Sequence, residues 1–270
     1  MSIRHYTPRR RTRGAASPVL IKAMGVALGA TVLMQILYPL VDGVDGGLLG
    51  VITIASVYTA ALAMFLHGIA AFGARYGWTL LGITLTFGYF IEQLGVSTSW
   101  PFGEYTYSDT LGPKIFSVPL VVPFAWVMIA HPCLVAARRI GRSWVFLYGA
   151  LLMMAWDLFL DPLMVTAGRW TWVVKGSHVP FQPEIPLSNT FGWLLSGMLL
   201  MTILHFSTPR ERRKVGGSLI AADILLFWTW FSGVVGNLFF FGRPGIAGFS
   251  GLILGLLLAP YFFNRWVGRP

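Results

Sequence analysis

Eight long apolar runs, separated by short polar or aromatic stretches, constrain this chain more than any other feature of its sequence. A helix that crosses the hydrocarbon core of a bilayer needs about 20 mostly apolar residues. Because lipid offers the backbone no hydrogen-bond partners, such runs are predicted to be helices. The expected spans are Val19–Leu40, Gly47–Phe72, Gly77–Val96, Ser117–Ala137, Ser143–Thr166, Thr190–Phe206, Gly216–Phe240 and Gly245–Phe263.

The composition supports the bilayer as the solvent of this chain. Hydrophobic residues make up 56% and charged residues 11%, whereas soluble domains carry about 25% charged residues. We therefore predict an all-α, polytopic transmembrane bundle of about eight helices, with no convincing strands. The expected organisation is a basic disordered cytoplasmic tail over residues 1–18, one transmembrane helical domain over residues 19–264, and a short cytoplasmic tail over residues 265–270.

The distribution of basic residues predicts how the bundle is oriented. With eight spans, sixteen of the twenty Lys and Arg residues fall on the side that holds both termini; the other side holds Lys114, Arg169, Lys175 and Arg243. Cytoplasmic loops carry the excess of basic residues. Both termini are thus expected in the cytoplasm, and the protein in the cytoplasmic membrane of a bacterial cell. The net charge of +10 reflects this orientation, and no fingerprint predicts binding to nucleic acid.

Cysteine and histidine usage argues against a metal centre. The single cysteine, Cys133, excludes an internal disulfide framework and a Cys-rich metal cluster. His67, His131 and His205 are expected to be scattered near cytoplasmic helix ends, and no His-x-x-x-His or Glu-x-x-His pair occurs. No Gly-rich nucleotide fingerprint is present either. We therefore expect no metal or other cofactor.

Three carboxylates fall inside the expected spans at a similar depth. Asp157 and Asp161 stand four positions apart, so they share one helix face. At about 1.5 Å per residue, they lie roughly 20 and 26 Å from the cytoplasmic end of their helix, and Glu92 lies roughly 22 Å along another. Glu104 and Asp109 follow in the loop just beyond, and Asn189 and Asn237 lie at a similar depth. Polar chemistry is therefore predicted in one layer, in the outer half of the membrane.

The Asp157–Asp161 pair predicts a proton-transfer site. An ionisable side chain within a span costs several kcal/mol and by default marks function. Two carboxylates this close repel each other, so one is expected to stay protonated and to act as an acid. The structural alternatives are a turn role for Asp161 before Pro162, and a hydrogen bond from Asp157 to a neighbouring helix. We favour the functional interpretation for the pair.

Four sequence blocks resemble one family. They are "EQLGVSTSWPFGEYTYSDTLGP" (Glu92–Pro113), "VPLVVPFAW" (Val118–Trp126), "WDLFLDPLMVTAGRWTW" (Trp156–Trp172) and "IPLSNTFGW" (Ile185–Trp193). Together they resemble the integral-membrane carotenoid 1,2-hydratases, which include bisanhydrobacterioruberin hydratase-like proteins. The resemblance implies water addition to the terminal C1–C2 double bond of an acyclic carotenoid, giving a tertiary alcohol. It also implies a carotenoid substrate within the bilayer, water and lipid as partners, and other enzymes of the carotenoid pathway nearby.

This chemistry needs an acid, aromatic faces that stabilise a cation, and one controlled water. We expect Asp157 to be the acid, with Asp161, Glu92 and Glu104 as catalytic partners. The loops Ser97–Phe116 and Ala167–Asn189 are rich in aromatic residues, which suit either an interfacial belt or a substrate pocket. The expected substrate-binding residues are Trp100, Tyr105, Tyr107, Trp126, Trp156, Trp170, Trp172, Asn189 and Trp193.

Three other functions stay open on sequence alone. Asp157-x-x-x-Asp161 is similar to one Asp motif of membrane prenyltransferases, which bind magnesium diphosphate, although we find no second Asn/Asp-rich motif. A proton-coupled transporter would also use buried carboxylates, but no inverted repeat is evident. The third alternative is a non-catalytic scaffold that binds lipid.

Overall fold

The structure, a computed structural model, describes residues 14–41, 46–209 and 213–267. Within these residues, eight helices are long and apolar enough to cross a membrane, which confirms the predicted helix bundle. Most of the predicted basic tail, residues 1–13, lies outside the described residues, as do residues 268–270 of the predicted second tail. The helices are α1 (Pro18–Val41), α2 (Gly46–Phe72), α3 (Ala74–Thr98), α4 (Val121–Ile140), α5 (Val145–Thr166), α6 (Leu187–Ser207), α7 (Ile220–Val235) and α8 (Pro244–Trp266). The span of α7 is completed by a π-helix, η3 (Gly236–Phe240), which continues it directly.

Helix α4 forms the centre of the bundle. In its most apolar stretch 83% of the residues are buried within the protein, compared with 22% in α1. The outer helices instead expose large apolar side chains such as Leu33, Phe90 and Leu252. Lipid is as apolar as these side chains, so their exposure costs little in a bilayer. The burial pattern is therefore that of a bundle whose outer surface faces lipid.

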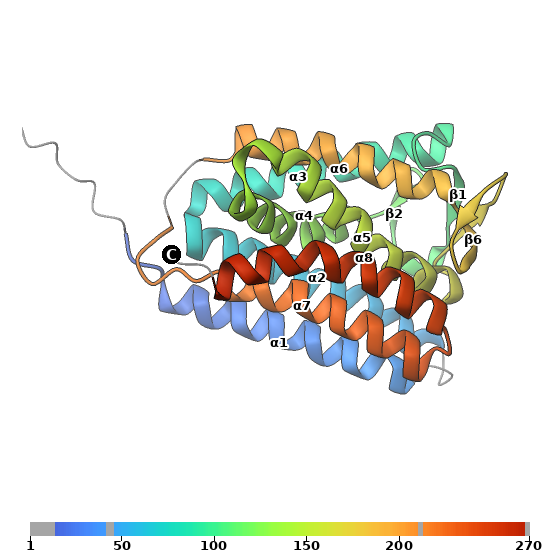
Figure 1. Cartoon of the computed structure of the whole chain (residues 1–270), viewed down its shortest axis with the longest axis horizontal. Helices are drawn as coiled ribbons and strands as arrows, with labels where there is room; N and C mark the ends of the chain where they lie inside the picture. The colour runs from blue at the N-terminus through green and yellow to red at the C-terminus, as the bar shows by residue number, and fades with distance from the viewer. Residues whose placement is uncertain (1–13, 42–45, 210–212, 268–270) are drawn as a thin grey trace, which may run out of the picture.

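The end of the bundle opposite the chain termini carries short strands (Figure 1). They are β1 (Glu104–Tyr107), β2 (Lys114–Ile115), β3 (Val118–Pro119), β4 (Trp170–Val173), β5 (His178–Val179) and β6 (Gln182–Pro186). They form three two-stranded antiparallel sheets, β1–β4, β2–β3 and β5–β6. The expectation of no strands is wrong here. The strands lie in the loops between the apolar runs. They are too short to be detected by a search for apolar runs long enough to span a membrane.

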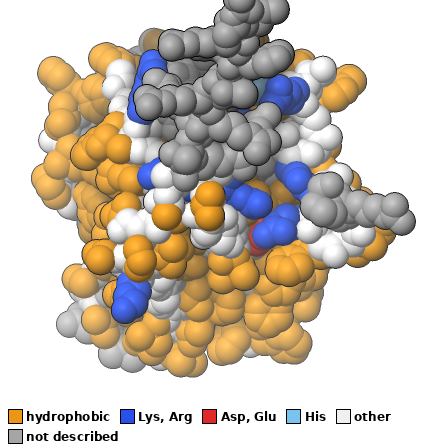
Figure 2. Space-filling model, turned by 90° about the vertical axis from the view of Figure 1, so that its left-hand side faces the viewer, with side chains coloured by type: hydrophobic (Ala, Val, Ile, Leu, Met, Phe, Trp, Pro, Cys, Tyr) orange, Lys and Arg blue, Asp and Glu red, His pale blue; other side chains and the backbone are white. Residues whose placement is uncertain are grey.

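The end of the bundle away from the strands is basic. Figure 2 looks onto this end, where Lys and Arg side chains gather. Arg138 and Arg139 lie in the last turn of α4, and Arg265 lies in the last turn of α8. Arg265 also pairs with the buried Asp223, whose other oxygen accepts a hydrogen bond from Tyr261. Asp223 therefore joins α7 to α8 near this end.

Two of the three helix-end histidines are not scattered as expected. His67 of α2 and His131 of α4 are both buried, and His67 Nδ1 lies 2.7 Å from His131 Nε2. His67 Nε2 lies 2.9 Å from the backbone oxygen of Ser218. The sequence separation of 64 residues hides this pair from any local motif, and it forms because α2 packs against α4. The two histidines therefore form a hydrogen bond between α2 and α4.

The orientation of the bundle stays a prediction that reporter fusions test. Fusions at Gly73, Gly141 and Lys214 should report the cytoplasm, and fusions at Gly112, Gly176 and Gly242 should report the other side, because basic residues favour the cytoplasmic loops. A protease-accessible tag at the same six positions provides an independent check. Two successive fusions on the same side would contradict the predicted alternation.

Candidate active site

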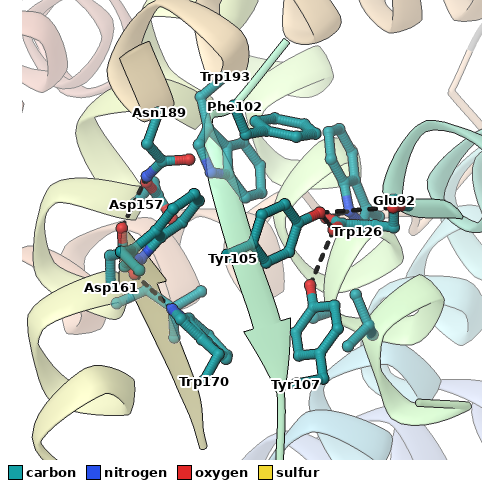
Figure 3. A pocket seen from close by; sticks show the side chains of 14 residues that line it. Glu92, Phe102, Tyr105, Tyr107, Trp126, Asp157, Asp161, Trp170, Asn189 and Trp193 are labelled. Carbon is teal, nitrogen blue, oxygen red and sulfur yellow. Dashed lines mark hydrogen bonds between the residues drawn. The ribbon is translucent and has the colours of Figure 1, made fainter. Parts of the chain in front are cut away.

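A buried cavity lies at the strand-bearing end of the bundle, between α3, α4, α5 and α6 (Figure 3). Strands β1 and β4 cover it. It offers about 60 Å³ to the centres of water molecules, which is room for several waters because one needs about 10–15 Å³ on this measure. Ten of the predicted site residues line it: Glu92, Tyr105, Tyr107, Trp126, Asp157, Asp161, Trp170, Trp172, Asn189 and Trp193.

Glu92 of α3 forms one acidic pole of the cavity. Its Oε1 accepts a hydrogen bond from Trp126 Nε1 at 2.9 Å, and its Oε2 accepts from the hydroxyls of Tyr105 at 2.6 Å and Tyr107 at 2.8 Å. Three donors of this kind suit an ionised carboxylate. The approach of β1 to α3 requires a small residue one turn further along, because a Cβ on Gly95 would lie 2.7 Å from the Tyr105 hydroxyl oxygen.

The two tyrosines that hold Glu92 lie outside the spanning helices. Burial, and then the neighbouring Glu92 carboxylate, raise the pKa of both Tyr105 and Tyr107 well above the ordinary value. Both hydroxyls therefore keep their protons across the physiological pH range and stay hydrogen-bond donors to Glu92.

Asp161 of α5 forms the opposite pole. Its Oδ1 accepts hydrogen bonds from Trp170 Nε1 at 2.5 Å and Trp172 Nε1 at 3.0 Å. The two tryptophans alternate with Thr171 along β4, so they lie on the same face of the strand. The amide of Asn189 donates to Asp161 Oδ2 at 2.7 Å. Asp161 thus has three donors, as Glu92 does, and α5 continues through Pro162 to Thr166 rather than ending in a turn.

Asp157 lies one helical turn before Asp161 and has fewer partners. Among the described residues it accepts one side-chain hydrogen bond, from Asn189 Nδ2 to Oδ2 at 2.8 Å. The single amide group of Asn189 therefore holds both aspartates, giving one hydrogen to each. The side chain of Asp157 is buried and lines the cavity. Of the three carboxyls that line the cavity, it is the one with the least support for a negative charge.

Aromatic rings form the walls between the two poles. Trp126 and Trp193 stack with ring centroids 4.5 Å apart and an interplanar angle of 12°. The ring of Tyr105 lies 4.6 Å from that of Trp172. These two residues are also direct partners in the β1–β4 sheet, and Tyr107 is the partner of Trp170. Pairing of the two loops therefore fixes one wall, and Figure 3 shows Tyr105 between the Glu92 side and the aspartate side.

Three predicted site residues lie away from the cavity. Glu104 precedes Tyr105 on β1, and the alternation of the strand turns its carboxylate outward to pair with Lys175 at 2.6 Å. Trp100 is 55% exposed. Trp156 is buried on α5, but it lines a different hollow. The structure therefore does not place these three side chains at the cavity, and the catalytic role predicted for Glu104 and the substrate-binding roles predicted for Trp100 and Trp156 stay predictions.

Four cavity residues were not predicted from the sequence. Phe102, Val122, Ala125 and Leu160 complete the lining. Phe102 belongs to the aromatic loop that was singled out, so aromatic content could have found it. The other three are aliphatic residues within spans and carry no local signal. Within the described part of the chain, no group of three or more His, Cys, Asp and Glu side chains is placed to hold a metal.

The outward position of Glu104 gives a testable prediction. Glu104→Gln removes an exposed ion pair with Lys175, and such pairs contribute about 0–1 kcal/mol. We expect the variant to keep the stability of the parent and whatever activity the cavity has. Thermal unfolding in detergent and product formation both measure this. A large loss of activity at normal stability would return Glu104 to the catalytic set.

Comparisons with known proteins place this chain in a family. An α-helical membrane bundle with a buried acidic and aromatic cavity is the class that the fold and site define. Residues 49–258 match the model of a family described as carotenoid biosynthesis protein. Since the match covers more than half of the chain, the protein belongs to the carotenoid biosynthesis protein family.

One curated relative has a defined name. The chain is 33% identical over 194 residues to a protein of Haloarcula japonica named bisanhydrobacterioruberin hydratase. The aligned region covers 66% of this chain and 63% of the relative, so the chain spans less than two thirds of the relative's length. No solved structure matches significantly.

Proposed function

We propose that this protein is a carotenoid hydratase that adds water across the terminal C1–C2 double bond of an acyclic carotenoid end. The observation that carries the proposal is a buried cavity with acidic poles on two sides and aromatic rings between them, in which Asp157 is the carboxyl with the fewest hydrogen-bond donors. The family match and the name of the Haloarcula japonica relative support hydration of a carotenoid as the reaction.

Asp157 is the proton donor in this proposal. Desolvation disfavours an isolated charge, and Asp157 has one donor whereas Asp161 and Glu92 have three each. Of the two neighbouring aspartates, Asp161 carries the negative charge and Asp157 the proton. Transfer of this proton to C2 of the alkene breaks the π bond and leaves a tertiary cation at C1.

The cavity stabilises that cation in two ways. Trp126, Trp193 and Tyr105 line the cavity around it, and aromatic rings attract cations. Glu92 supplies a fixed negative charge on the far side, held in place by its three donors before the reaction begins. Preorganised charge of this kind lowers the barrier because nothing has to reorient as the cation forms.

Water captures the cation at C1 and then loses one proton. Asp161 accepts this proton, since it lies one turn from Asp157 and shares Asn189 with it. A C–O bond and a C–H bond form, one π bond and one O–H bond of water break, and the aspartate pair ends with the one proton that it had at the start. Return of this proton from Asp161 to Asp157 restores the starting state, so the cycle consumes no external acid, base, oxidant or reductant.

Expression in cells that make an acyclic carotenoid tests the proposal. Extracted pigment should gain the mass of one water when the protein is present, with unchanged polyene absorption because the terminal double bond is not conjugated. Cells carrying the empty vector are the control. No hydrated pigment, together with a magnesium-dependent activity on a prenyl diphosphate, would replace this proposal with the prenyltransferase alternative.

A further inference from the structure

A second hollow lies beside the cavity, between α1, α2, α5 and α7. It offers about 160 Å³ to the centres of water molecules, against about 60 Å³ in the cavity. Val57 of α2, Trp156, Phe159 and Leu163 of α5, and Phe241 after α7 are among the residues that line it. We call this hollow the side groove.

The side groove and the cavity share one wall residue, Leu160. Trp156, Phe159 and Leu163 lie on the groove face of α5, and Asp157 and Asp161 lie on the cavity face. At about 100° per residue along the helix, Leu160 falls between these two faces. It is partly buried, as expected for a side chain with open space on both sides. The two hollows are therefore neighbours that adjoin at Leu160.

Several polar groups of the side groove are hydrogen-bonded within the protein, whereas the buried Oδ1 of Asn237 accepts no hydrogen bond from the described residues. The Thr53 hydroxyl donates to the backbone oxygen of Leu49, and the Ser56 hydroxyl donates to that of Thr53. Gln35 Oε1 accepts from Trp228 Nε1. A ligand in the groove consequently meets a mainly apolar surface, which favours an apolar ligand.

The size of the cavity requires a place for the rest of the substrate. The cavity has room for only a few waters, whereas a carotenoid is a long, stiff hydrocarbon of which only the last carbons react. We propose that the side groove binds the adjoining apolar chain of the substrate, and that the reacting end passes Leu160 to reach Asp157. This inference rests on the proposed function, because it takes a carotenoid-like isoprenoid as the occupant of the groove.

Two groove-filling variants test this assignment. Ser56→Phe and Ser232→Phe add a ring from α2 and from α7, two of the four helices around the groove. The matched control is Gly82→Phe, which adds the same ring at an exposed position of α3 where a new Cβ meets nothing within 4 Å. Each variant is assayed with a long acyclic carotenoid and with a short acyclic terpene that has the same terminal double bond.

The expected result is a change in chain-length preference. Filling the groove should lower the ratio of long-substrate to short-substrate kcat/KM by about tenfold or more, because several buried methylenes lose their contacts. Gly82→Phe should leave the ratio unchanged. Equal falls with both substrates, or no fall with the long one, would overturn the inference while leaving hydration itself intact.

A binding measurement separates this inference from the proposed reaction. The full-length parent and the groove-filled variants are purified from carotenoid-producing cells, and the bound pigment is measured by absorption. We expect groove-filled variants to lose about nine tenths of the pigment that the parent retains, which corresponds to the same tenfold effect. Pigment that stays bound while a co-purifying phospholipid is lost would show that the groove holds a lipid acyl chain and would overturn the proposal, whether or not the parent hydrates anything.

Discussion

Asp157→Asn is expected to abolish hydration while the protein still folds and inserts. General acid catalysis contributes about 10²–10⁴-fold to a rate, so a loss of this size should follow when the proton donor is removed. Asn has the shape of Asp, and its oxygen can still accept the hydrogen bond that Asn189 donates to Asp157. The variant should therefore accumulate in the membrane like the parent. Product formation per unit of purified protein measures the loss.

The same substitution outside the cavity controls for this result. Asp109 is exposed, and its carboxylate pairs with Lys114 at 2.7 Å. Asp109→Asn should leave hydration unchanged, since its carboxylate does not line the cavity. If Asp157→Asn keeps most of its activity, the proton comes from another group, and Asp161 becomes the first candidate to test.

Glu92→Gln is expected to lower kcat by about a hundredfold, because removal of one preorganised electrostatic partner of a transition state costs about 10²–10³-fold. The substitution removes the negative charge and keeps the local packing. The amide oxygen that it introduces can accept from Trp126, and the hydroxyls of Tyr105 and Tyr107 can rotate to accept from the new amide nitrogen. The effect should appear in kcat more than in KM, since the cation exists only near the transition state.

A milder substitution beside Glu92 provides the comparison for Glu92→Gln. Tyr107→Phe removes one of the three donors to Glu92 and leaves the charge in place. We expect a loss several times smaller than that of Glu92→Gln. An equal loss in the two variants would show that Glu92 acts by holding β1 in position rather than by its charge.

The helices and the two poles follow from local features of the sequence. The eight spans follow from run length, because the bilayer leaves the backbone few options. Asp157 and Asp161 share a face because they stand one helical turn apart. Glu92 joins them because its depth along α3 matches theirs. Depth and helical period are both local, so no knowledge of tertiary contacts was needed to predict these three together.

The orientation of the loop residues depends on pairing that the sequence does not display. Tyr105 faces the cavity and Glu104 faces away because β1 pairs with β4 in one register, and a shift by one residue would exchange them. Two whole helices, α4 and α5, separate these strands along the chain, so no local cue sets the register. The position of Leu160 between the two hollows also has no local signal in the sequence, because it depends on how α5 packs against α4 and α7.

The most direct test of the central claim follows the atoms of water into the product. Purified protein in lipid nanodiscs is given an acyclic carotenoid in water labelled with heavy oxygen, and separately in deuterated water, and the product is analysed by mass spectrometry and NMR. We predict one heavy oxygen at C1 and one deuterium at C2 in each hydrated end, with neither label incorporated by Asp157→Asn. A parent protein that forms no labelled alcohol from any acyclic carotenoid, or that places the oxygen on a carbon other than C1, would contradict this account.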